Sequence, residues 1–220
     1  INHNVASEQM FKYSEIAVGQ KNKKKNNDII LGYLSENNEH NDNLEVLIPS
    51  LQKIFREFKN VRFYIIGHLD IPEELKEFSS QIKIKSFTRS FRNWKDLPSL
   101  ISKFDINIAP IASNIFNEAK SENKWLEASL VKVPTIASNF GVFKEVIKDG
   151  ETGLLCNNSD DWYKELKNLI VNDTLKTIIS ENAYNYCKDN YNAVKTGFKL
   201  ASIINKVANK HIGFIVPNLD

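Results

Sequence analysis

The sequence has few of the residues that build disulfides and metal sites. Its 220 residues include only two cysteines, Cys156 and Cys187, which lie far apart without a metal-ligand or redox spacing. We therefore expect reduced thiols in a cytoplasmic protein, each filling the core or lying on the surface. The four histidines, at positions 3, 40, 68 and 211, show no ligand spacing either, so no metal site is expected.

Long apolar runs and a strong excess of one charge are also missing. No stretch approaches the length of a membrane span, and the sequence has neither a signal-peptide core nor an initiator methionine. Because it begins at Ile1, we expect a piece of a longer protein. The net charge of +2 is too small and too dispersed to indicate nucleic-acid binding.

One local run departs from this even distribution of charge. The segment Gln20 to Asp28 is basic, rich in asparagine and free of apolar residues, and it directly precedes an apolar run. We interpret it as a solvated linker; the alternative is an electrostatic patch for anionic lipid or another polyanion. Residues 1–27 are thus predicted to form an N-terminal segment or linker.

Hydrophobic residues make up 42 % of the chain, and their strand and helix periods alternate along it. Strands are expected at 28–34, 61–67, 82–87, 105–110, 134–138 and 153–156. Helices are expected at 43–58, 72–79, near 96–103, from 121 onward and near 141–147, with an all-helical part from 160 to 210. This alternation predicts an α/β fold: a Rossmann-like parallel sheet with helices on both faces, plus C-terminal helices.

Ligands of such sheets bind beyond the carboxyl ends of the strands, so the loops that directly follow strands are the candidate sites. Two such loops are residues 32–43, GYLSENNEHNDN, and residues 111–124, IASNIFNEAKSENK. In the first loop, Gly32 permits a close backbone approach, and Ser35 and His40 offer polar contacts. Neither loop has G-x-G-x-x-G or G-x-x-x-x-G-K-[ST], so neither a dehydrogenase nor a P-loop NTPase is expected.

The helix after the second loop has an unusual start. Ser121 is a natural N-cap, yet Lys124 stands where a capping box has Glu or Gln. A lysine at the positive end of the helix dipole costs a few tenths to about 1 kcal/mol, and Lys120 adds positive charge. Free amides beside two lysines form, in physical terms, a diphosphate site.

Glu127 follows Lys124 by three residues and therefore lies on the same helix face, one turn deeper. Its carboxylate suits the vicinal hydroxyls of a sugar. The alternative is an exposed ion pair between Lys124 and Glu127, worth roughly 0.3 kcal/mol and without a functional role. The spacing alone leaves both interpretations open.

Longer segments resemble a known family. KSENKWLEASLVKVPTIASNFGVFKEVIKDGETGLL, residues 120–155, resembles the C-terminal, donor-binding half of retaining glycosyltransferases of the GT-B fold, family four, also called glycosyl transferases group 1. Residues 32–69 and 94–110 are similar to further parts of that domain, and the resemblance covers roughly 28–191. It implies a nucleotide-sugar-binding domain at residues 28–210.

The resemblance also implies roles for single residues. Glu127 corresponds to the second glutamate of the family's E-x7-E motif, a ligand of the nucleotide ribose. Gly32 falls where the family's glycine-containing loop meets the phosphates, and His40 where many members place a basic phosphate-binding residue. The base is expected near Phe87 and Thr88, with a plain core position as the alternative for Phe87.

One position departs from the family pattern. Ala119 replaces the first glutamate of the motif, which usually contacts the donor sugar, so Asn117 or Glu118 is expected to stand in. The sequence matches a subgroup pattern, N-x-A-K-S-x-x-K-x-x-E, in which lysines take a larger share of the diphosphate. The predicted donor site comprises Gly32, Ser35, His40, Phe87, Thr88, Asn117, Glu118, Lys120, Ser121, Lys124 and Glu127.

The resemblance implies an enzyme that transfers a sugar from a nucleotide donor to a glycan or polysaccharide acceptor. It further implies bacterial-type surface polysaccharide assembly, in the cytoplasm or at the inner face of the membrane. No metal or other cofactor is implied, because positive side chains and the helix dipole stabilise the leaving nucleoside diphosphate. Two rival functions stay open: a GT-B-fold sugar-nucleotide epimerase, and a non-catalytic nucleotide-binding or interaction module.

The acceptor is expected to bind through a second domain that this chain lacks, so the fragment alone is expected to be inactive. The tail HIGFIVPNLD, residues 211–220, has a strand-like run followed by a turn signal. We expect it to begin a further Rossmann domain of the full-length protein. The alternative is a C-terminal strand that completes the present sheet.

Overall fold

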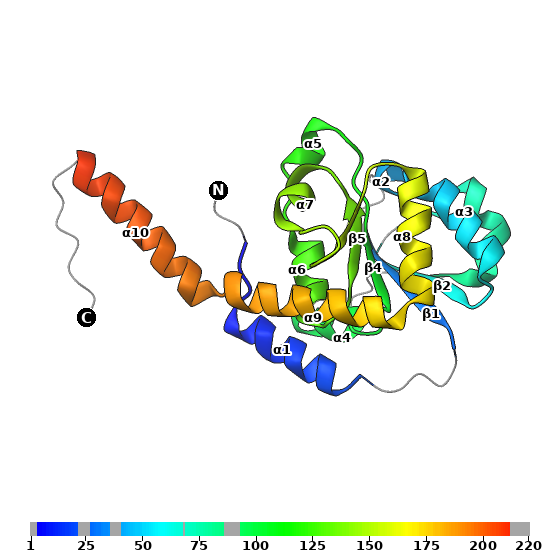
Figure 1. The fold of residues 1–220 in the computed structure, drawn as a ribbon, viewed down its shortest axis with the longest axis horizontal. Coiled ribbons are helices and arrows are strands. Elements are labelled where there is room, and N and C mark those ends of the chain that lie inside the picture. The colour runs from blue at the N-terminus through cyan, green and yellow to red at the C-terminus, as the bar shows by residue number, and fades with distance from the viewer. Residues whose placement is uncertain (1–3, 22–26, 36–40, 68, 86–92, 212–220) are drawn as a thin grey trace.

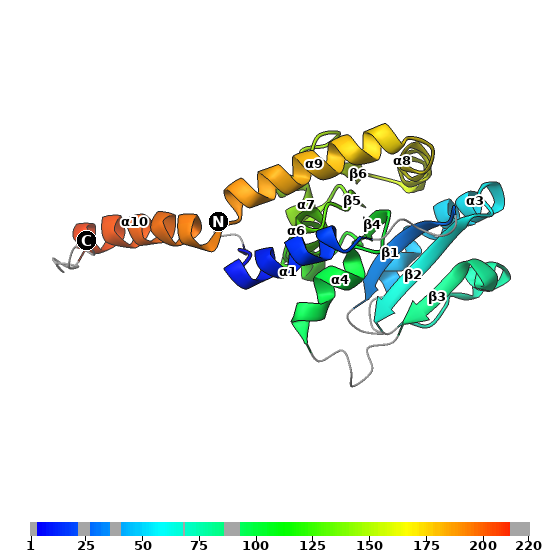
Figure 2. The same ribbon diagram turned by 90° about the horizontal axis from the view of Figure 1, so that it is seen from below.

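The protein folds as a parallel sheet covered by helices on both faces, and one long C-terminal helix extends away from this body (Figure 1, Figure 2). The computed structural model describes residues 4–21, 27–35, 41–67, 69–85 and 93–211. The layers and the C-terminal helices confirm the predicted α/β fold class.

Six parallel strands form the sheet, in the order β3-β2-β1-β4-β5-β6. Their bounds are β1 Ile29–Ser35, β2 Val61–Gly67, β3 Ile82–Lys85, β4 Ile106–Ala109, β5 Thr135–Ser138 and β6 Leu154–Cys156. The strand order reverses between β1 and β4, so the connections that leave these two strands run to opposite sides of the sheet. The carboxyl ends of β1 and β4 therefore flank the expected ligand position.

The helices cover the sheet and continue into a helical C-terminal part. Their bounds are α1 Glu8–Gly19, α2 Asn41–Glu45, α3 Ile48–Glu57, η2 Glu73–Gln81, η4 Trp94–Asp96, α4 Leu97–Ile101, α5 Ile115–Glu118, α6 Asn123–Leu130, α7 Gly141–Val146, α8 Ser159–Val171, α9 Asp173–Asn190 and α10 Ala193–His211.

The helices differ from expectation in three places. The predicted helix 43–58 is two helices, and Pro49, which has no N–H to donate, stands in the first turn of α3. The predicted helix 72–79 is a 3-10 helix, η2. Periodicity predicts neither α1 nor α5, because α1 buries only Ser14 and Ala17, and α5 is a single turn.

The structure describes most of the predicted N-terminal segment, whereas the end of the predicted C-terminal tail lies outside it. Helix α1 lies within residues 1–27 and packs Ala17 against α4. Residues 212–220 lie outside the described ranges, so the expected strand in the tail stays a prediction. None of the helices within the described ranges combines the length and the hydropathy that crossing a membrane requires.

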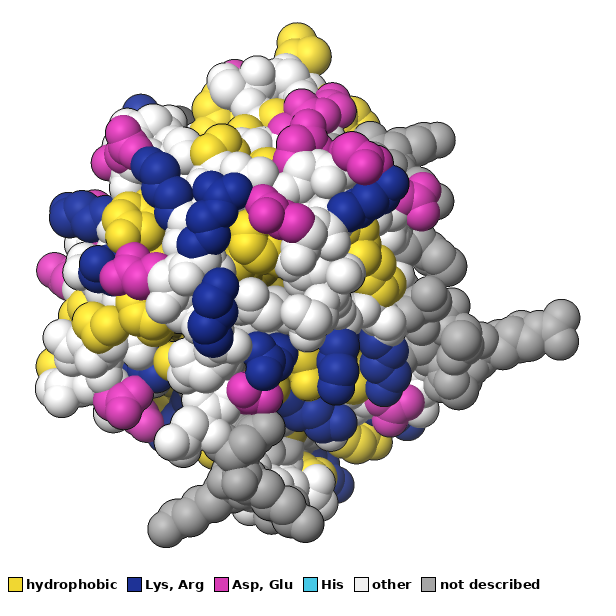
Figure 3. Space-filling model, turned by 90° about the vertical axis from the view of Figure 1, so that its right-hand side faces the viewer, with side chains coloured by type: hydrophobic (Ala, Val, Ile, Leu, Met, Phe, Trp, Pro, Cys, Tyr) yellow, Lys and Arg dark blue, Asp and Glu magenta, His cyan; other side chains and the backbone are white. Residues whose placement is uncertain are grey.

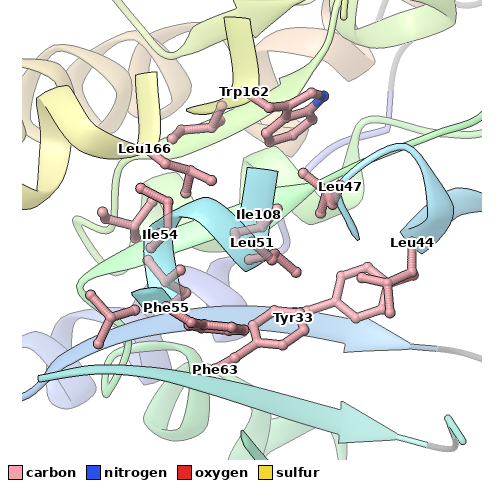
Figure 4. Close-up of a cluster of buried hydrophobic side chains, with 14 of the residues drawn as sticks. Tyr33, Leu44, Leu47, Leu51, Ile54, Phe55, Phe63, Ile108, Trp162 and Leu166 are labelled. Atoms are coloured by element: carbon pink, nitrogen blue, oxygen red, sulfur yellow. The ribbon is translucent and has the colours of Figure 1, made fainter. Parts of the chain in front are cut away.

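On one face of the sheet, α3 is packed between the strands and α8 (Figure 4). The rings of Tyr33 on β1 and Phe63 on β2 stack with their centroids 6.2 Å apart. Phe55 of α3 and Trp162 of α8 are fully buried in the same cluster. Because alternate residues of a strand point to opposite faces, Tyr33 belongs to this core while Gly32 faces the other.

On the opposite face, α1, α4 and α6 cover the sheet, and Phe104 lies directly against Gly32. A Cβ atom added at Gly32 would stand 2.0 Å from the Cδ2 atom of the Phe104 ring. Next to this contact, Asp105 accepts a hydrogen bond from Ile30 N (2.6 Å) and donates its own N–H to Ile30 O (2.8 Å). Glycine at position 32 thus lets β4 enter the sheet beside β1.

We predict that Gly32→Ala destabilises the fold, because the added methyl group cannot fit without moving Phe104. Overpacking of this kind costs about 1–3 kcal/mol, which chemical denaturation followed by circular dichroism would measure. Gly19→Ala is the matched control, because a Cβ at Gly19 meets nothing within 4 Å. Equal free energies of unfolding for the two variants would contradict this account of Gly32.

Candidate functional site

The candidate site lies at the carboxyl ends of β1 and β4. The strand β1 ends at Ser35, whose side chain is buried, and α2 begins at Asn41. Beyond β4, the chain forms the one-turn helix α5 and then α6. The described ends of these two connections therefore lie at the switch point of the sheet, where a ligand site is expected.

A hydrogen-bonded tie joins these two connections. The Asn43 Oδ1 atom accepts from Ala112 N (2.8 Å) and from Asn117 Nδ2 (2.9 Å). Asn117 Nδ2 also donates to Ala112 O (2.7 Å), and Asn117 N donates to Asn114 Oδ1 (2.8 Å). Both Asn43 and Asn117 are buried, at 3 % and 2 % exposure. The tie fixes the path of the chain into α5.

Asn117 and Glu118, the two candidates for the sugar contact, have different surroundings. The amide group of Asn117 is used inside the tie, and its Oδ1 atom is buried without a hydrogen-bond partner. Glu118 is exposed and lines a surface cleft. Of the two side chains, Glu118 is therefore the one that a ligand in this cleft can reach directly.

This cleft, about 860 Å³ in volume, lies between the start of α6 and the start of α7. Its lining includes Glu118, Lys120, Ser121, Gly141 and Lys144. Gly141 has φ +54, in the left-handed region, and a Cβ there would approach the Asn117 carbonyl oxygen to 3.3 Å. A glycine at this position thus lets α7 begin close to α5.

The start of α6 differs from the predicted capping. The helix begins at Asn123 with Glu122 as its N-cap residue, so the prediction of Ser121 as the N-cap was wrong. The reason is that Glu122 O accepts from both Trp125 N and Leu126 N, which closes the first turn one residue later. The Glu122 side chain does not cap the helix and instead accepts from Asn4 N (3.0 Å).

Lys120 lies in the loop before α6 and Lys124 in the first turn of α6, and each stands over an aromatic ring. Lys120 Nζ is 5.4 Å from the ring centroid of Phe116, and Lys124 Nζ is 5.4 Å from that of Tyr33. Within the eight residues of α6, the first turn contains Lys124 and no acidic residue. Lys124 therefore brings its charge to β1, while Lys120 brings its charge to the cleft.

The body of α6 is anchored to the sheet below it. Asn107 of β4 is buried, and its Nδ2 atom donates to Lys124 O (3.0 Å) and to Thr135 Oγ1 (3.0 Å). Trp125 is fully buried and donates from Nε1 to Thr152 O (2.8 Å). Glu127, half-buried, lies on the same face as Lys124. The first turn of α6 is thus held on both sides, which orients Lys124 and Glu127.

The remaining predicted positions fall into two groups. His40, Phe87 and Thr88 lie outside the described residues, so their roles stay predictions. Gly32 lies in the middle of β1 with Tyr64 and Asn107 as its register partners. The close contact with Phe104 explains why position 32 needs a glycine. The phosphate contact of Gly32 stays a prediction.

The two cysteines are both buried, and neither lines this cleft. Burial raises the pKa of Cys187 to about 12, and it also raises the pKa of Cys156 far above its ordinary value. Both thiols therefore stay protonated at neutral pH, which is consistent with core filling. Within the described residues, no three His, Cys, Asp or Glu side chains come together as a metal site.

Comparison with known proteins assigns the family. The family model of the glycosyl transferases group 1 matches residues 28–172. The chain belongs to this family. Its sequence is 26 % identical over 170 residues to that of an uncharacterized glycosyltransferase of Methanocaldococcus jannaschii. The matched part is 70 % of this chain and 43 % of that protein.

Solved structures share the fold of this group 1 domain. One is the C-terminal domain of a group 1 glycosyl transferase, LpcC, from Francisella tularensis, with a TM-score of 0.56 at 18 % identity. This match covers 87 % of our chain and 97 % of the LpcC domain. HepE of Anabaena, in complex with UDP-glucose, has a TM-score of 0.61 at 16 % identity. The match covers 93 % of this chain and 54 % of the HepE chain. The chain thus spans about half the length of HepE and less than half of the curated relative.

The hydrogen-bonded tie at Asn43 has a measurable consequence. We predict that Asn43→Ala lowers the free energy of unfolding by about 1–3 kcal/mol, because the partly buried Ala112 N–H loses its acceptor and the buried Asn117 amide loses one of its two acceptors. Asn43→Ala and Asn117→Ala should be non-additive, with a coupling of about 0.5–3 kcal/mol in a double-mutant cycle. Asn190→Ala, an exposed amide that donates to Tyr186 O, is the control and should change stability by less than about 0.5 kcal/mol. Additive losses would show that the tie does not act as a unit.

Proposed function

We propose that this group 1 domain binds the nucleotide-sugar donor of a retaining glycosyltransferase that acts on a glycan or polysaccharide acceptor. The observation that carries the proposal is the start of α6, which brings Lys120, Lys124 and Glu127 to the carboxyl edge of the sheet next to the switch point. HepE, which shares the fold, has been solved with UDP-glucose, and this supports a nucleotide sugar as the ligand class.

The diphosphate is the anion that the start of α6 would take. Lys124 contributes a charge within the first turn, and Lys120 contributes one from the preceding loop. The backbone amides of that turn add the positive end of the helix dipole. Glu122 is 3 % exposed and its side chain accepts a hydrogen bond from Asn4 N, and both residues line the same cleft as Lys120.

The nucleoside and the sugar would lie on either side of this diphosphate. Glu127, one turn along α6 from Lys124, is positioned to accept hydrogen bonds from the two ribose hydroxyls. Glu118 in the cleft would contact hydroxyls of the donor sugar, since the Asn117 amide is occupied by Asn43 and Ala112. The donor would then run from the β1 side of α6 into the cleft.

The same residues would assist the chemical step. When the bond between the anomeric carbon and the β-phosphate oxygen breaks, negative charge grows on the leaving diphosphate. Lys120 and Lys124 lie where they stabilise that charge, and stabilisation of a leaving group in the transition state accelerates transfer. On this proposal the domain needs no metal, and the acceptor and its binding groups come from another domain of the full-length enzyme.

The experiment that tests this assignment compares nucleosides with their diphosphates. Titration calorimetry with UDP, GDP and dTDP first identifies the base. Lys120→Ala and Lys124→Ala should each weaken the diphosphate by about tenfold or more and leave the nucleoside unchanged, since a charged hydrogen bond contributes about 1.5–3 kcal/mol. Glu127→Ala should weaken nucleoside and diphosphate alike, because its ribose contact is common to both.

Two exposed residues serve as matched controls for this titration. Lys164→Ala on α8 and Glu151→Ala before β6 remove the same charges at positions that do not line the cleft. Circular dichroism verifies that each variant is folded. If the lysine variants weaken nucleoside as much as diphosphate, the lysines are structural and the diphosphate assignment fails. Unchanged affinity in Glu127→Ala would remove the ribose assignment.

A second prediction concerns activity and metals. The isolated chain should bind the nucleotide sugar but should not transfer the sugar, because the acceptor is not held next to the donor. Chelation with EDTA should leave its affinity for nucleoside diphosphate unchanged. Release of free diphosphate with and without an oligosaccharide acceptor measures transfer. Transfer by the chain alone, conversion of one sugar nucleotide into another, or loss of affinity on chelation would each contradict the proposal.

A further inference from the structure

A further pocket, which we call the Trp162 pocket, lies at the same edge of the sheet as the cleft. Its volume is about 560 Å³, a size typical of small-molecule sites. It lies between the carboxyl ends of β4, β5 and β6 and the starts of α3 and α8, and Phe140 lines both the pocket and the cleft. Because the proposed donor has to reach this edge in the whole enzyme, the pocket lies where substrates pass.

A buried indole N–H points to a ligand in this pocket. Trp162, near the start of α8, is 2 % exposed, and its Nε1 atom donates to no residue that the structure describes. Figure 4 shows this atom on the side of the ring turned away from Leu166 and Ile54. Within the described ranges, the fully enclosed polar atoms without a partner are Asn107 Oδ1 and Asn117 Oδ1, so the Trp162 nitrogen opens to the pocket instead. A buried indole N–H usually has an acceptor, which a ligand would supply here.

The other polar groups of the pocket offer both donors and acceptors. Ser138 Oγ accepts from Ile111 N (2.9 Å), which leaves its own proton to donate. Asn139 donates from Nδ2 to Asn157 Oδ1 (2.9 Å), which leaves the Asn139 Oδ1 atom as an acceptor. The exposed carboxylate of Glu45 is a further acceptor. Since a hydroxyl group both donates and accepts, this mixture suits a ligand with several hydroxyl groups.

The pocket does not suit an anion. Among the described residues that line it, Glu45 alone carries a charge. The start of α8 is capped by Asn158, which accepts from Asp161 N (3.0 Å), and its first turn contains Asp160 and Asp161. Charged side chains are plentiful elsewhere, since the side of the domain at the right of Figure 1 carries both basic and acidic ones (Figure 3). A phosphate would therefore prefer the cleft with Lys120 to this pocket.

We propose that the Trp162 pocket binds one neutral sugar unit of the glycan acceptor, away from its reacting end. Trp162 Nε1 and Ser138 Oγ would donate to oxygens of this sugar, and Asn139 Oδ1 and Glu45 would accept from its hydroxyl groups. The C–H face of the ring would pack on the apolar part of the lining, which is Val46, Pro49, Ile111 and Phe140.

This inference rests on the proposed function, because the acceptor of that function supplies the sugar unit. The reacting end of the glycan would still be held by the other domain. The pocket therefore adds affinity for the glycan and does not give the chain alone the ability to transfer sugar.

NMR of the indole N–H groups in the 220-residue chain tests the proposal. The sequence has three tryptophans, and Trp94→Phe and Trp162→Phe assign their resonances. In a titration with methyl glycosides of glucose, galactose and N-acetylglucosamine, at least one glycoside should shift the Trp162 resonance. The Trp125 resonance should stay in place, because Trp125 Nε1 already donates to Thr152 O. The shift should persist in saturating UDP, GDP or dTDP, because the diphosphate occupies the cleft.

Two pairs of variants then measure affinity by saturation-transfer NMR of the glycoside. Trp162→Phe keeps an aromatic ring but removes the donor, so it should weaken the glycoside by about 2- to 10-fold, the size of one neutral hydrogen bond. Trp94→Phe, an exposed tryptophan outside the lining, should leave the affinity unchanged. The anionic methyl glucuronide should bind more weakly than methyl glucoside. Glu45→Gln should reduce this difference, whereas Glu151→Gln, also exposed and outside the lining, should not.

The outcomes separate failure of this inference from failure of the proposed function. If nucleoside diphosphate binds but no glycoside moves the Trp162 resonance, the sugar site is overturned and the donor assignment stands. Glycoside binding without diphosphate binding would support the sugar site and remove the donor assignment. A Trp162 shift caused by diphosphate alone, equal binding of glucuronide and glucoside, or unchanged affinity in Trp162→Phe would each overturn the inference. Glu45→Gln does not alter the core, so this arm decides even if Trp162→Phe fails to fold.

Discussion

The side-chain oxygen of Asn43 is the acceptor on which the geometry of the candidate site depends. In an open parallel sheet, the connections after β1 and β4 leave the switch point on opposite sides, and no strand pairing holds them together. Asn43 Oδ1 bridges this gap by accepting from the backbone of Ala112 and the side chain of Asn117. Because all three groups are at least partly buried, loss of the acceptor would leave donors that water cannot fully compensate.

The path of the chain beyond this tie follows from a second buried amide. Asn107 of β4 donates to the carbonyl of Lys124 and to the hydroxyl of Thr135. It therefore joins the first turn of α6 to two neighbouring strands at once. Asn43 fixes where the loop enters α5, and Asn107 fixes where α6 begins, so the segment with Lys120 runs between two anchored points. Such support allows a loop to present charged groups at a defined place.

Sequence patterns predict the layers of this fold better than its site. All six strands were expected, because short buried strands produce continuous apolar runs. The strand predicted at 61–67 has the same bounds in the structure. The helix α1 was missed because it buries only two small residues and has no strong apolar stripe. Asn43 was missed because an asparagine in a polar loop has no periodic signal, and its role appears only when two distant loops meet. Ser121 was wrongly assigned as the N-cap, since the side chains of serine and glutamate do not reveal which carbonyl closes the first turn.

The lysine that first marked this site is stable in the free domain for a local reason. A lysine in the first turn opposes the helix dipole at a cost of about 0.3–1 kcal/mol. A cation over an aromatic face contributes roughly 0.5–1 kcal/mol, and Lys124 Nζ lies 5.4 Å from the ring centroid of Tyr33. These two effects are of similar size, so the charge needs no bound anion to be tolerated.

The two lysines differ in how firmly their aromatic partners are held. Tyr33 stacks on Phe63 inside the core, so the ring beneath Lys124 is fixed before any ligand arrives. Phe116, the ring next to Lys120, is 64 % exposed on a one-turn helix. The aromatic partner of Lys124 is therefore held by the core, whereas that of Lys120 stands at the surface of the domain.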